Sequence, residues 1–272
     1  MKPGRKIILN IIVVLIAVAT FLPFLWMISA SFMQAGESNS YPPKLIPDNF
    51  TTEHYENLFG RLNLTTYIIN SLLISLGVTF FSLILNSMSG YAFAKYRFAG
   101  KKKLFSLLLS SMIIPGQVTM LPVFLTLKNI GLINTYWAII VPGMASIFGI
   151  FLIRQFAMSI PDSLIESAKI DGAGDVEVYL KIILPLCRPI LLTLGIFTFM
   201  GTWNDFLWPL IVMTDSSMYT LPVALANLMG EHVQDTELMM AGSVITILPV
   251  VIVFLLLQKY YIKGIMMGSV KG

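Results

Sequence analysis

Six stretches that lack Asp, Glu, Lys and Arg constrain the fold of this chain more than any other feature. A helix that crosses about 30 Å of hydrocarbon needs about 20 mostly apolar residues, because its backbone N–H and C=O groups must pair within the segment. The stretches are 7–36, 62–94, 104–127, 129–153, 189–204 and 238–258, and the fifth is interrupted at Asp205 and then resumes as far as Thr214. They predict an all-α, polytopic membrane protein with six transmembrane helices, at about 8–29, 67–92, 105–127, 134–157, 187–213 and 239–260.

The composition excludes several other classes of protein. Charged residues make up 12% of the 272 residues, about half the share of an average soluble domain, which argues against a soluble enzyme, a nucleic-acid-binding protein or a disordered tail. The single cysteine, Cys187, excludes a disulfide framework and a multi-cysteine metal site. The two histidines, His54 and His232, lie far apart and outside the apolar stretches. We therefore expect no metal, no cofactor and no nucleic-acid partner, and a lipid bilayer as the surroundings.

The basic residues predict the orientation of the chain. Of the 18 Lys and Arg residues, all but Lys44, Arg61 and Lys128 lie at the two termini or in the connections around 95–103 and 154–188. Six crossings place both termini on one side, and Lys and Arg accumulate on the cytoplasmic side of membrane proteins. Both termini are therefore predicted to be cytoplasmic. No connection is long enough for a separate domain, so we expect one transmembrane domain over 1–272.

The first apolar segment and the two longest external segments each allow two readings. The first apolar segment has a basic start and Ile28-Ser29-Ala30 after it, which is weakly similar to a signal-peptide cleavage site. Its apolar core exceeds 20 residues, longer than the roughly 7–15 of a signal peptide, which favours a retained helix. The external segments 30–66 and 214–238 are either solvated connectors or surfaces that contact a partner.

The cytoplasmic loop at about 159–186 carries a recognisable pattern. Ser163 and Glu166 have the spacing of a capping box, and Asp171-Gly172 suits a helix C-terminus. Asp175 is placed to cap a second short helix. The spacing predicts a short helix between two sharp breaks, with Gly172 and Gly174 permitting the turn. Because so short a helix is unstable alone, it needs a surface to dock against.

The same loop resembles the EAA loop (E-A-A-x3-G-x9-I-x-L-P) of the permease subunits of bacterial ABC importers. Glu166-Ser167-Ala168 is followed after three residues by Gly172 and after nine more by Ile182-x-Leu184-Pro185, with Ser167 in place of the first Ala. Further segments are similar to the carbohydrate-uptake branch, and above all to the second, six-span membrane subunit of maltose-type importers. These are 90–98, Pro115-Gly116-Gln117, 203–210 and Gly268-Ser269-Val270-Lys271-Gly272.

This resemblance implies a fold, a function and a set of partners. It implies the type I ABC importer transmembrane-domain fold in the bacterial cytoplasmic membrane, half of a translocation pore for a sugar or oligosaccharide. The partners it implies are a second permease subunit, cytoplasmic ATPase subunits and an extracellular solute-binding protein. It assigns ATPase coupling to the EAA loop residues Glu166, Ser167, Ala168, Lys169, Asp171 and Gly172. The chain has no G-x4-G-K-[ST] segment, so we expect it not to be an enzyme and the nucleotide site to belong to a partner.

Several residues have a structural reading beside the functional one. Glu166 either contacts the ATPase or completes a capping box, and Lys169 and Asp171 either pair with the ATPase or are solvated. Trp203, Asn204 and Asp205 either line or gate the sugar path, or tie neighbouring helices together. Pro115-Gly116 and Pro142-Gly143 are expected to break their helices.

Two other functions remain open from the sequence. An importer of the same architecture for another polar solute, such as a phosphorylated polyol, is the first alternative. An ion-coupled secondary carrier is the second, although such carriers need several intramembrane ionisable groups and this chain offers only Asp205.

Overall fold

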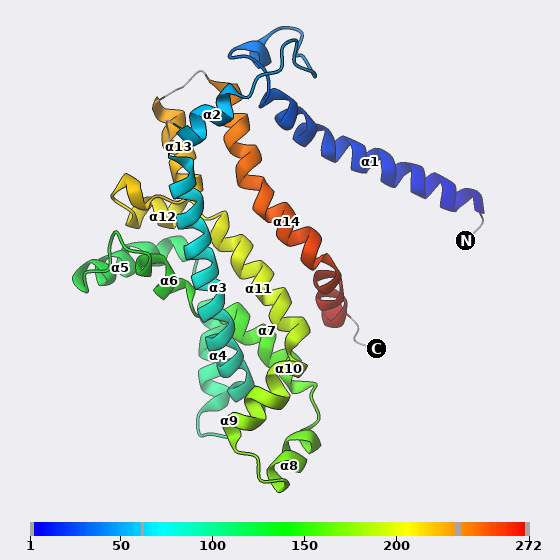
Figure 1. Ribbon diagram of the computed structural model, residues 1–272. Coiled ribbons are helices and arrows are strands. Elements are labelled where there is room, and N and C mark those ends of the chain that lie inside the picture. The colour runs from blue at the N-terminus through cyan, green and yellow to red at the C-terminus, as the bar shows by residue number, and fades with distance from the viewer. Residues whose placement is uncertain (1–2, 61–62, 232–234, 270–272) are drawn as a thin grey trace. The chain divides into compact units, whose positions relative to one another are not determined.

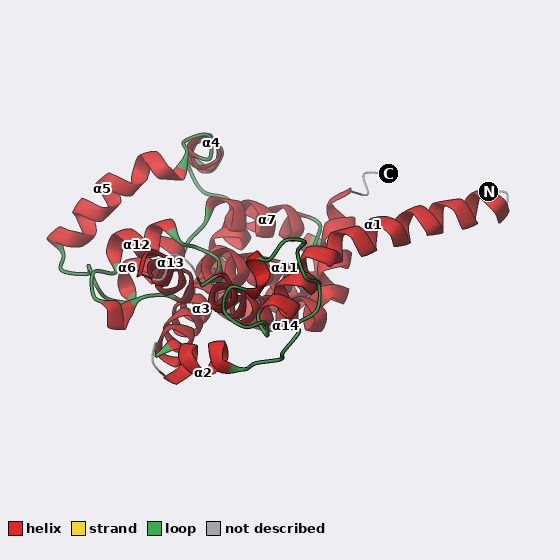
Figure 2. Cartoon of the chain, turned by 90° about the horizontal axis from the view of Figure 1, so that it is seen from above, coloured by secondary structure: helices red, strands yellow, loops and turns green. Residues whose placement is uncertain are grey.

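The computed structural model describes residues 3–60, 63–231 and 235–269, and most of these residues are helical, with no strand among them (Figures 1 and 2). Four helices are long and apolar enough to cross a membrane, and two pairs of sharply bent helices bring the number of spans to as many as six. The all-helical membrane fold that the apolar stretches predict is confirmed. His232 and the end of the tail, Val270 to Gly272, lie outside the described residues.

The elements follow one another along the chain as helices joined by short connections. In order they are α1 (Pro3–Ala30), η1 (Glu37–Asn39), α2 (Glu53–Gly60), α3 (Leu64–Lys95), α4 (Lys101–Ser111), α5 (Gly116–Asn129), α6 (Trp137–Gly143), α7 (Ile147–Met158), α8 (Asp162–Ile170), α9 (Asp175–Val178), the π-helical turn η2 (Tyr179–Ile183), α10 (Leu184–Leu186), α11 (Arg188–Trp203), α12 (Leu207–Val212), η3 (Ser216–Met218), α13 (Leu221–Glu231) and α14 (Thr236–Ser269).

The chain divides into two compact units. Unit 1 comprises Met1–Thr66 and Ala224–Val250, and unit 2 comprises Tyr67–Val223 and Val251–Gly272. In unit 1 no residue in the most apolar part of α1 is buried against the described residues, as expected of a helix that faces lipid or another subunit. The segment after α1 is held by buried polar groups: His54 Nε2 lies 2.9 Å from the Met33 carbonyl oxygen, and the carboxylate of Glu237 accepts a 2.8 Å hydrogen bond from the Ser38 N–H.

Unit 2 contains the helix breaks that its prolines predict. The third span consists of α4 and α5, which meet at an angle of 104° before Pro115-Gly116. In the fourth span α6 ends at Pro142-Gly143 and α7 resumes at Ile147. Both breaks are confirmed. Each follows from proline, which has no N–H to donate and clashes with the preceding turn.

The prediction of one continuous helix over 187–213 is wrong. The segment begins at a bend of 76°, which separates the preceding helices α9 to α10 (175–186) from α11. Helix α11 then ends at Trp203, and three residues separate it from α12. Asp205 therefore lies in this break and not along a membrane-spanning helix, because the backbone at Asn204 (φ −91°, ψ 0°) ends the helical run there.

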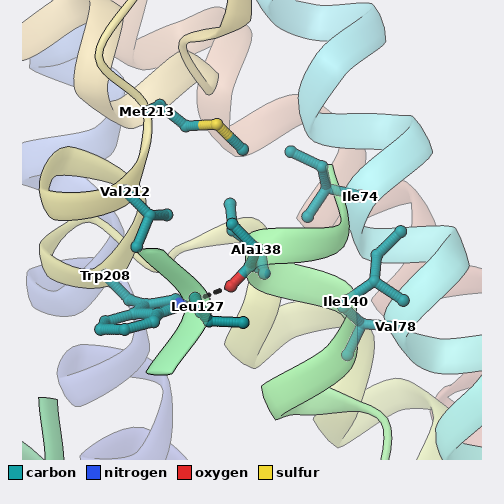
Figure 3. Packing of buried hydrophobic residues seen from close by; sticks show 9 residues of the cluster. Ile74, Val78, Leu127, Ala138, Ile140, Trp208, Val212 and Met213 are labelled. Atoms are coloured by element: carbon teal, nitrogen blue, oxygen red, sulfur yellow. Dashed lines mark hydrogen bonds between the residues drawn. The ribbon is translucent and has the colours of Figure 1, made fainter. Parts of the chain in front are cut away.

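An apolar cluster fixes α12 against the broken fourth span. Buried residues of α3, α5, α6 and α12 meet in this first cluster, which consists of Ile74, Val78, Leu127, Ala138, Ile139, Ile140, Trp208, Val212 and Met213 (Figure 3). The indole N–H of Trp208 donates a 3.0 Å hydrogen bond to the Ala138 carbonyl oxygen. That carbonyl belongs to α6, which breaks at Pro142, four residues later. The bond therefore joins α12, which follows the break after α11, to the broken fourth span in one core.

A second apolar cluster lies where α3, α7 and α11 approach the loop that carries α8. Its buried residues are Tyr91, Ile153, Ile160, Val178, Ile183, Cys187, Ile190 and Leu194. Helices α3 and α7 come so close here that a Cβ atom on Gly90 would lie 2.7 Å from the Ile153 side chain and 3.0 Å from the backbone nitrogen of Arg154. The second cluster is therefore a closely packed surface against which the loop that carries α8 lies.

Candidate functional site

Helix α8 begins two residues earlier than the capping-box prediction requires. Its N-cap is Pro161, with extended backbone (φ −61°, ψ 134°), and no side chain caps the helix. Ser163 and Glu166 therefore do not form a capping box, and that prediction is wrong. The physical reason is that Pro161 sets the start of the helix, which moves Ser163 into its first turn.

The end of α8 agrees with the sequence. The Gly172 N–H donates to the Lys169 carbonyl oxygen at 3.1 Å and the Ala173 N–H donates to the Ala168 carbonyl oxygen at 2.9 Å. This is the Schellman pattern, and Gly172 has the left-handed φ of +89° that it requires. Gly174 was expected to share this role, but its backbone is extended (φ −72°, ψ 162°), a conformation open to any residue.

Two ion pairs hold α8 in place. Asp162 accepts a 2.6 Å hydrogen bond from the ammonium group of Lys95 at the end of α3, and this bond lowers the pKa of the Asp162 carboxyl. Beyond the turn, Lys169 pairs with Asp175 at 2.8 Å, and the hydrogen bond to Asp175 raises the pKa of Lys169. Asp175 was predicted to cap the second helix, but it is the first residue of α9, and Gly174 is the N-cap. The Asp175 side chain instead connects α9 to α8 through its pair with Lys169.

The inner face of α8 packs on the second cluster. Ile165, Ala168 and Ala173 contact this cluster and are partly buried. Beneath them Tyr91 stacks on Tyr179, with ring centroids 5.8 Å apart. Packing against this buried apolar cluster explains how so short a helix is stable.

The outer side of α8 is exposed in the described part of the chain, and its Ser167 Oγ donates within the helix, to the Leu164 carbonyl oxygen at 3.2 Å. Glu166, Ser167 and Asp171 are exposed, and Ile170 is 85% exposed. Glu166 and Ile170 are four residues apart and therefore lie on one face of the helix. Figure 1 shows α8 at the lower end of unit 2, beside α9. We call Ser163, Glu166, Ser167 and Ile170 the outer face of α8. Ile170 and its neighbour across the turn, Val176, which is 72% exposed, were not singled out from the sequence, although apolar residues in a polar loop were the available signal.

The other predicted site residues lie around the break between α11 and α12. Trp203 is buried within this chain and stacks on Phe199, with ring centroids 6.0 Å apart. Asn204 is exposed, and its side-chain amide donates to the Met200 carbonyl oxygen at 2.8 Å. Asp205 is half-buried, and its carboxylate accepts hydrogen bonds from the backbone N–H groups at the start of α12.

We expect Asp205→Ala to lower uptake of the transported solute several-fold while the chain still assembles, because it removes the acceptor that holds the start of α12. Asp205→Asn retains a side-chain oxygen and is expected to keep most of the uptake. Uptake into cells, with membrane extraction of the complex as a control for assembly, measures both. A complex that falls apart in Asp205→Ala would show that this carboxylate is needed for assembly, which would contradict the prediction.

These features define a class: a helical, polytopic membrane protein whose spans are broken at prolines and whose longest loop on one side carries a docked short helix. The comparisons agree with this class. A family model described as "Binding-protein-dependent transport system inner membrane component" matches residues 86–266.

Curated relatives cover nearly the whole chain. The arabinooligosaccharides transport system permease protein AraQ of Halalkalibacterium halodurans is 38% identical over 94% of this chain and 93% of its own. The melibiose/raffinose/stachyose import permease protein MelC of Bacillus subtilis is 31% identical over 97% of this chain and 96% of its own. This chain belongs to the family of binding-protein-dependent transport system inner membrane components, and it is a permease subunit of that family.

A solved structure shows the same fold. A chain from the crystal structure of a bacterial ABC transporter involved in the import of the acidic polysaccharide alginate superposes with a TM-score of 0.84, at 23% identity, over 96% of this chain and 98% of that one. This chain therefore shares the fold of that transporter chain.

Proposed function

We propose that this chain forms half of the translocation pore of an ATP-driven importer for a sugar or oligosaccharide, paired with a second permease subunit. The names of its relatives support the substrate class, since they refer to arabinooligosaccharides, to melibiose, raffinose and stachyose, and, for the protein NgcG of Streptomyces coelicolor, to diacetylchitobiose. The proposal makes the chain a transport subunit, with ATP hydrolysis supplied by separate cytoplasmic subunits.

The observation that carries the coupling part of this proposal is the geometry of α8. One face packs on the second cluster, while the outer face, with Glu166 and Ile170, is left to a partner. Two ion pairs and the turn at Gly172 fix the helix to unit 2, so a force applied to the outer face reaches the spans. The residues proposed to meet the ATPase are Glu166, Ser167, Ala168, Lys169, Asp171 and Gly172, with Ala168 acting through its packing and Lys169 through its pair with Asp175.

The orientation and the external partner follow from the same proposal. The side that carries α8 is proposed to be cytoplasmic, as are both termini, because most of the Lys and Arg residues lie there. A solute-binding protein is proposed to deliver the sugar from the other side. A second structural neighbour, with a TM-score of 0.65 at 17% identity, comes from a crystal structure of an alginate ABC transporter in complex with an alginate pentasaccharide-bound periplasmic protein.

The break between α11 and α12 is the proposed part of the substrate path or its gate. Asn204 and Asp205 present polar groups there, in a segment without regular helix. Trp203 anchors this segment through its buried ring.

Ile170→Asp tests the docking role of α8. We expect this variant to insert in the membrane but to lose the ATPase subunit on purification, with uptake of labelled oligosaccharide reduced at least about tenfold, because an apolar contact at the centre of an interface is replaced by a charge. Ile46→Asp is the matched control, since Ile46 is 77% exposed in unit 1, in the segment proposed to be external. Normal co-purification and uptake in Ile170→Asp would contradict the proposal.

A further inference from the structure

A cleft of basic residues lies where α3 ends and α4 begins. It has a volume of about 480 Å³ and is lined by Arg97, Phe98, Gly100, Lys101, Lys102 and Lys103, which we call the basic cleft. It is at the same end of unit 2 as α8, because Lys95, two residues before Arg97, pairs with Asp162 at the start of α8. The proposed coupling and substrate path use none of the lining residues.

Among the described residues, no carboxylate forms an ion pair with Arg97, Lys102 or Lys103, and only Asp162, which pairs with Lys95, interacts electrostatically with Arg97 at longer range. Lys101 is occupied in capping α3, since its ammonium group donates to the Tyr96 carbonyl oxygen at 2.8 Å and to that of Ala94 at 3.2 Å. The positive charges of Arg154, Arg97 and Lys95 act on Lys101 electrostatically.

The three lysines of the basic cleft, Lys101, Lys102 and Lys103, do not stabilise α4. They occupy its first turn, and that turn contains no acid. The N-terminal end of a helix carries partial positive charge, so cations there are unfavourable. An anion in the basic cleft would offset both the side-chain charges and this local repulsion.

Apolar side chains adjoin the cations and indicate what kind of anion fits. Phe98 lines the cleft itself, and along α4, Leu104 is 49% exposed and Leu107 is 68% exposed. No residue of α4 is buried within the chain. A small anion dissolved in water would gain nothing from these apolar side chains, whereas an amphiphile with a phosphate and acyl chains would contact both surfaces.

We propose that the basic cleft binds the headgroup of an anionic phospholipid, with its phosphate among Arg97, Lys102 and Lys103 and an acyl chain along Leu104 and Leu107. The cleft lies at the ends of two membrane-spanning segments, and the membrane surface is where such headgroups are found. The inference requires only that the chain lies in a bilayer. It does not depend on the sugar or on the ATPase.

The test measures lipid binding by the full chain, purified with its partner subunits in mild detergent. Native mass spectrometry is used to compare retention of dioleoylphosphatidylglycerol with dioleoylphosphatidylcholine, which has the same acyl chains. We expect the phosphatidylglycerol preference to fall at least about tenfold in the triple variant Arg97→Gln, Lys102→Gln, Lys103→Gln, because each cation that contacts the bound headgroup contributes on the order of a fivefold change in affinity. The control triple, Lys6→Gln, Lys181→Gln and Arg188→Gln, loses the same charge outside the cleft and is expected to change the preference less than about twofold. Should the cleft triple not fold, Lys102→Gln alone is expected to reduce the preference about fivefold.

Four results would overturn the proposal. An equal loss in both triples would mean that only net charge attracts the lipid. No change in the cleft triple, or in Lys102→Gln where only that variant folds, would exclude the cleft as the site. Inorganic phosphate that displaces phosphatidylglycerol at millimolar concentration would indicate a free-phosphate site. Loss of a partner subunit from the cleft triple, with lipid retention unchanged, would indicate a protein interface. Because none of these readouts is transport, failure here leaves the proposed import function untouched.

Discussion

Gly172→Val is expected to abolish uptake while the chain still inserts in the membrane. Gly172 has a φ of +89°, and a β-branched residue in this left-handed region costs about 1–3 kcal/mol. An added Cβ would meet no atom within 4 Å, so the effect is one of backbone conformation and not of a clash within the chain. The turn after α8 must then open, which misplaces the outer face against its partner. Uptake of labelled oligosaccharide into cells measures this effect.

Two control variants separate backbone conformation from bulk. Gly172→Asn accepts a left-handed conformation more readily and is expected to retain much of the uptake. Gly174→Val adds the same bulk two residues away, where the backbone is already extended and an added Cβ also meets nothing within 4 Å. Uptake by the Gly174→Val variant is expected to be close to that of the unchanged protein. Equal loss in all three variants would show that this surface tolerates no side chain at all, and the conformational explanation would be wrong.

Asn86→Leu is expected to have the largest effect on stability. Asn86 is fully buried in α3, and its side-chain oxygen accepts a 3.0 Å hydrogen bond from the Ser146 N–H at the start of α7. Its amide nitrogen donates to Ser82 Oγ at 2.7 Å. Leucine leaves the N–H of Ser146 without a partner where the fourth span is broken, at a cost of about 1–3 kcal/mol. Thermal denaturation in detergent is expected to show a midpoint lower by about 5 °C or more.

Ser82→Ala is the control for Asn86. It removes one acceptor of the same cluster but leaves the bond from Ser146 intact, so a smaller decrease in the denaturation midpoint is expected. A similar decrease in both variants would mean that the N-terminus of α7 does not depend on Asn86.

The sequence predicts the class of fold because the bilayer imposes one rule on every span. Charge-free stretches place the helices, and Pro115 and Pro142 place two of the breaks, since neither proline can continue a helix. The break after Trp203 was missed because Asp205 interrupts the apolar stretch at a single residue and no proline stands at the break. It is stabilised by tertiary contacts, among them Trp208 with the carbonyl of Ala138.

The candidate site was predictable in outline but not in its contacts. The glycine at 172 identified the end of α8 because a Schellman turn needs a left-handed residue. Its start was misplaced because Pro161, and not Ser163, ends the extended segment. The pairs of Lys95 with Asp162 and of Lys169 with Asp175 bring together residues from different helices, so they became visible only in the structure.

Stimulation of ATP hydrolysis by the loaded binding protein, measured in proteoliposomes, tests the coupling role of α8 most directly. The complex with intact chain is compared with one from which 163–171 has been removed. The proposed role of α8 predicts that the deletion removes the stimulation by cargo altogether. Undiminished, cargo-responsive hydrolysis without these residues would contradict it.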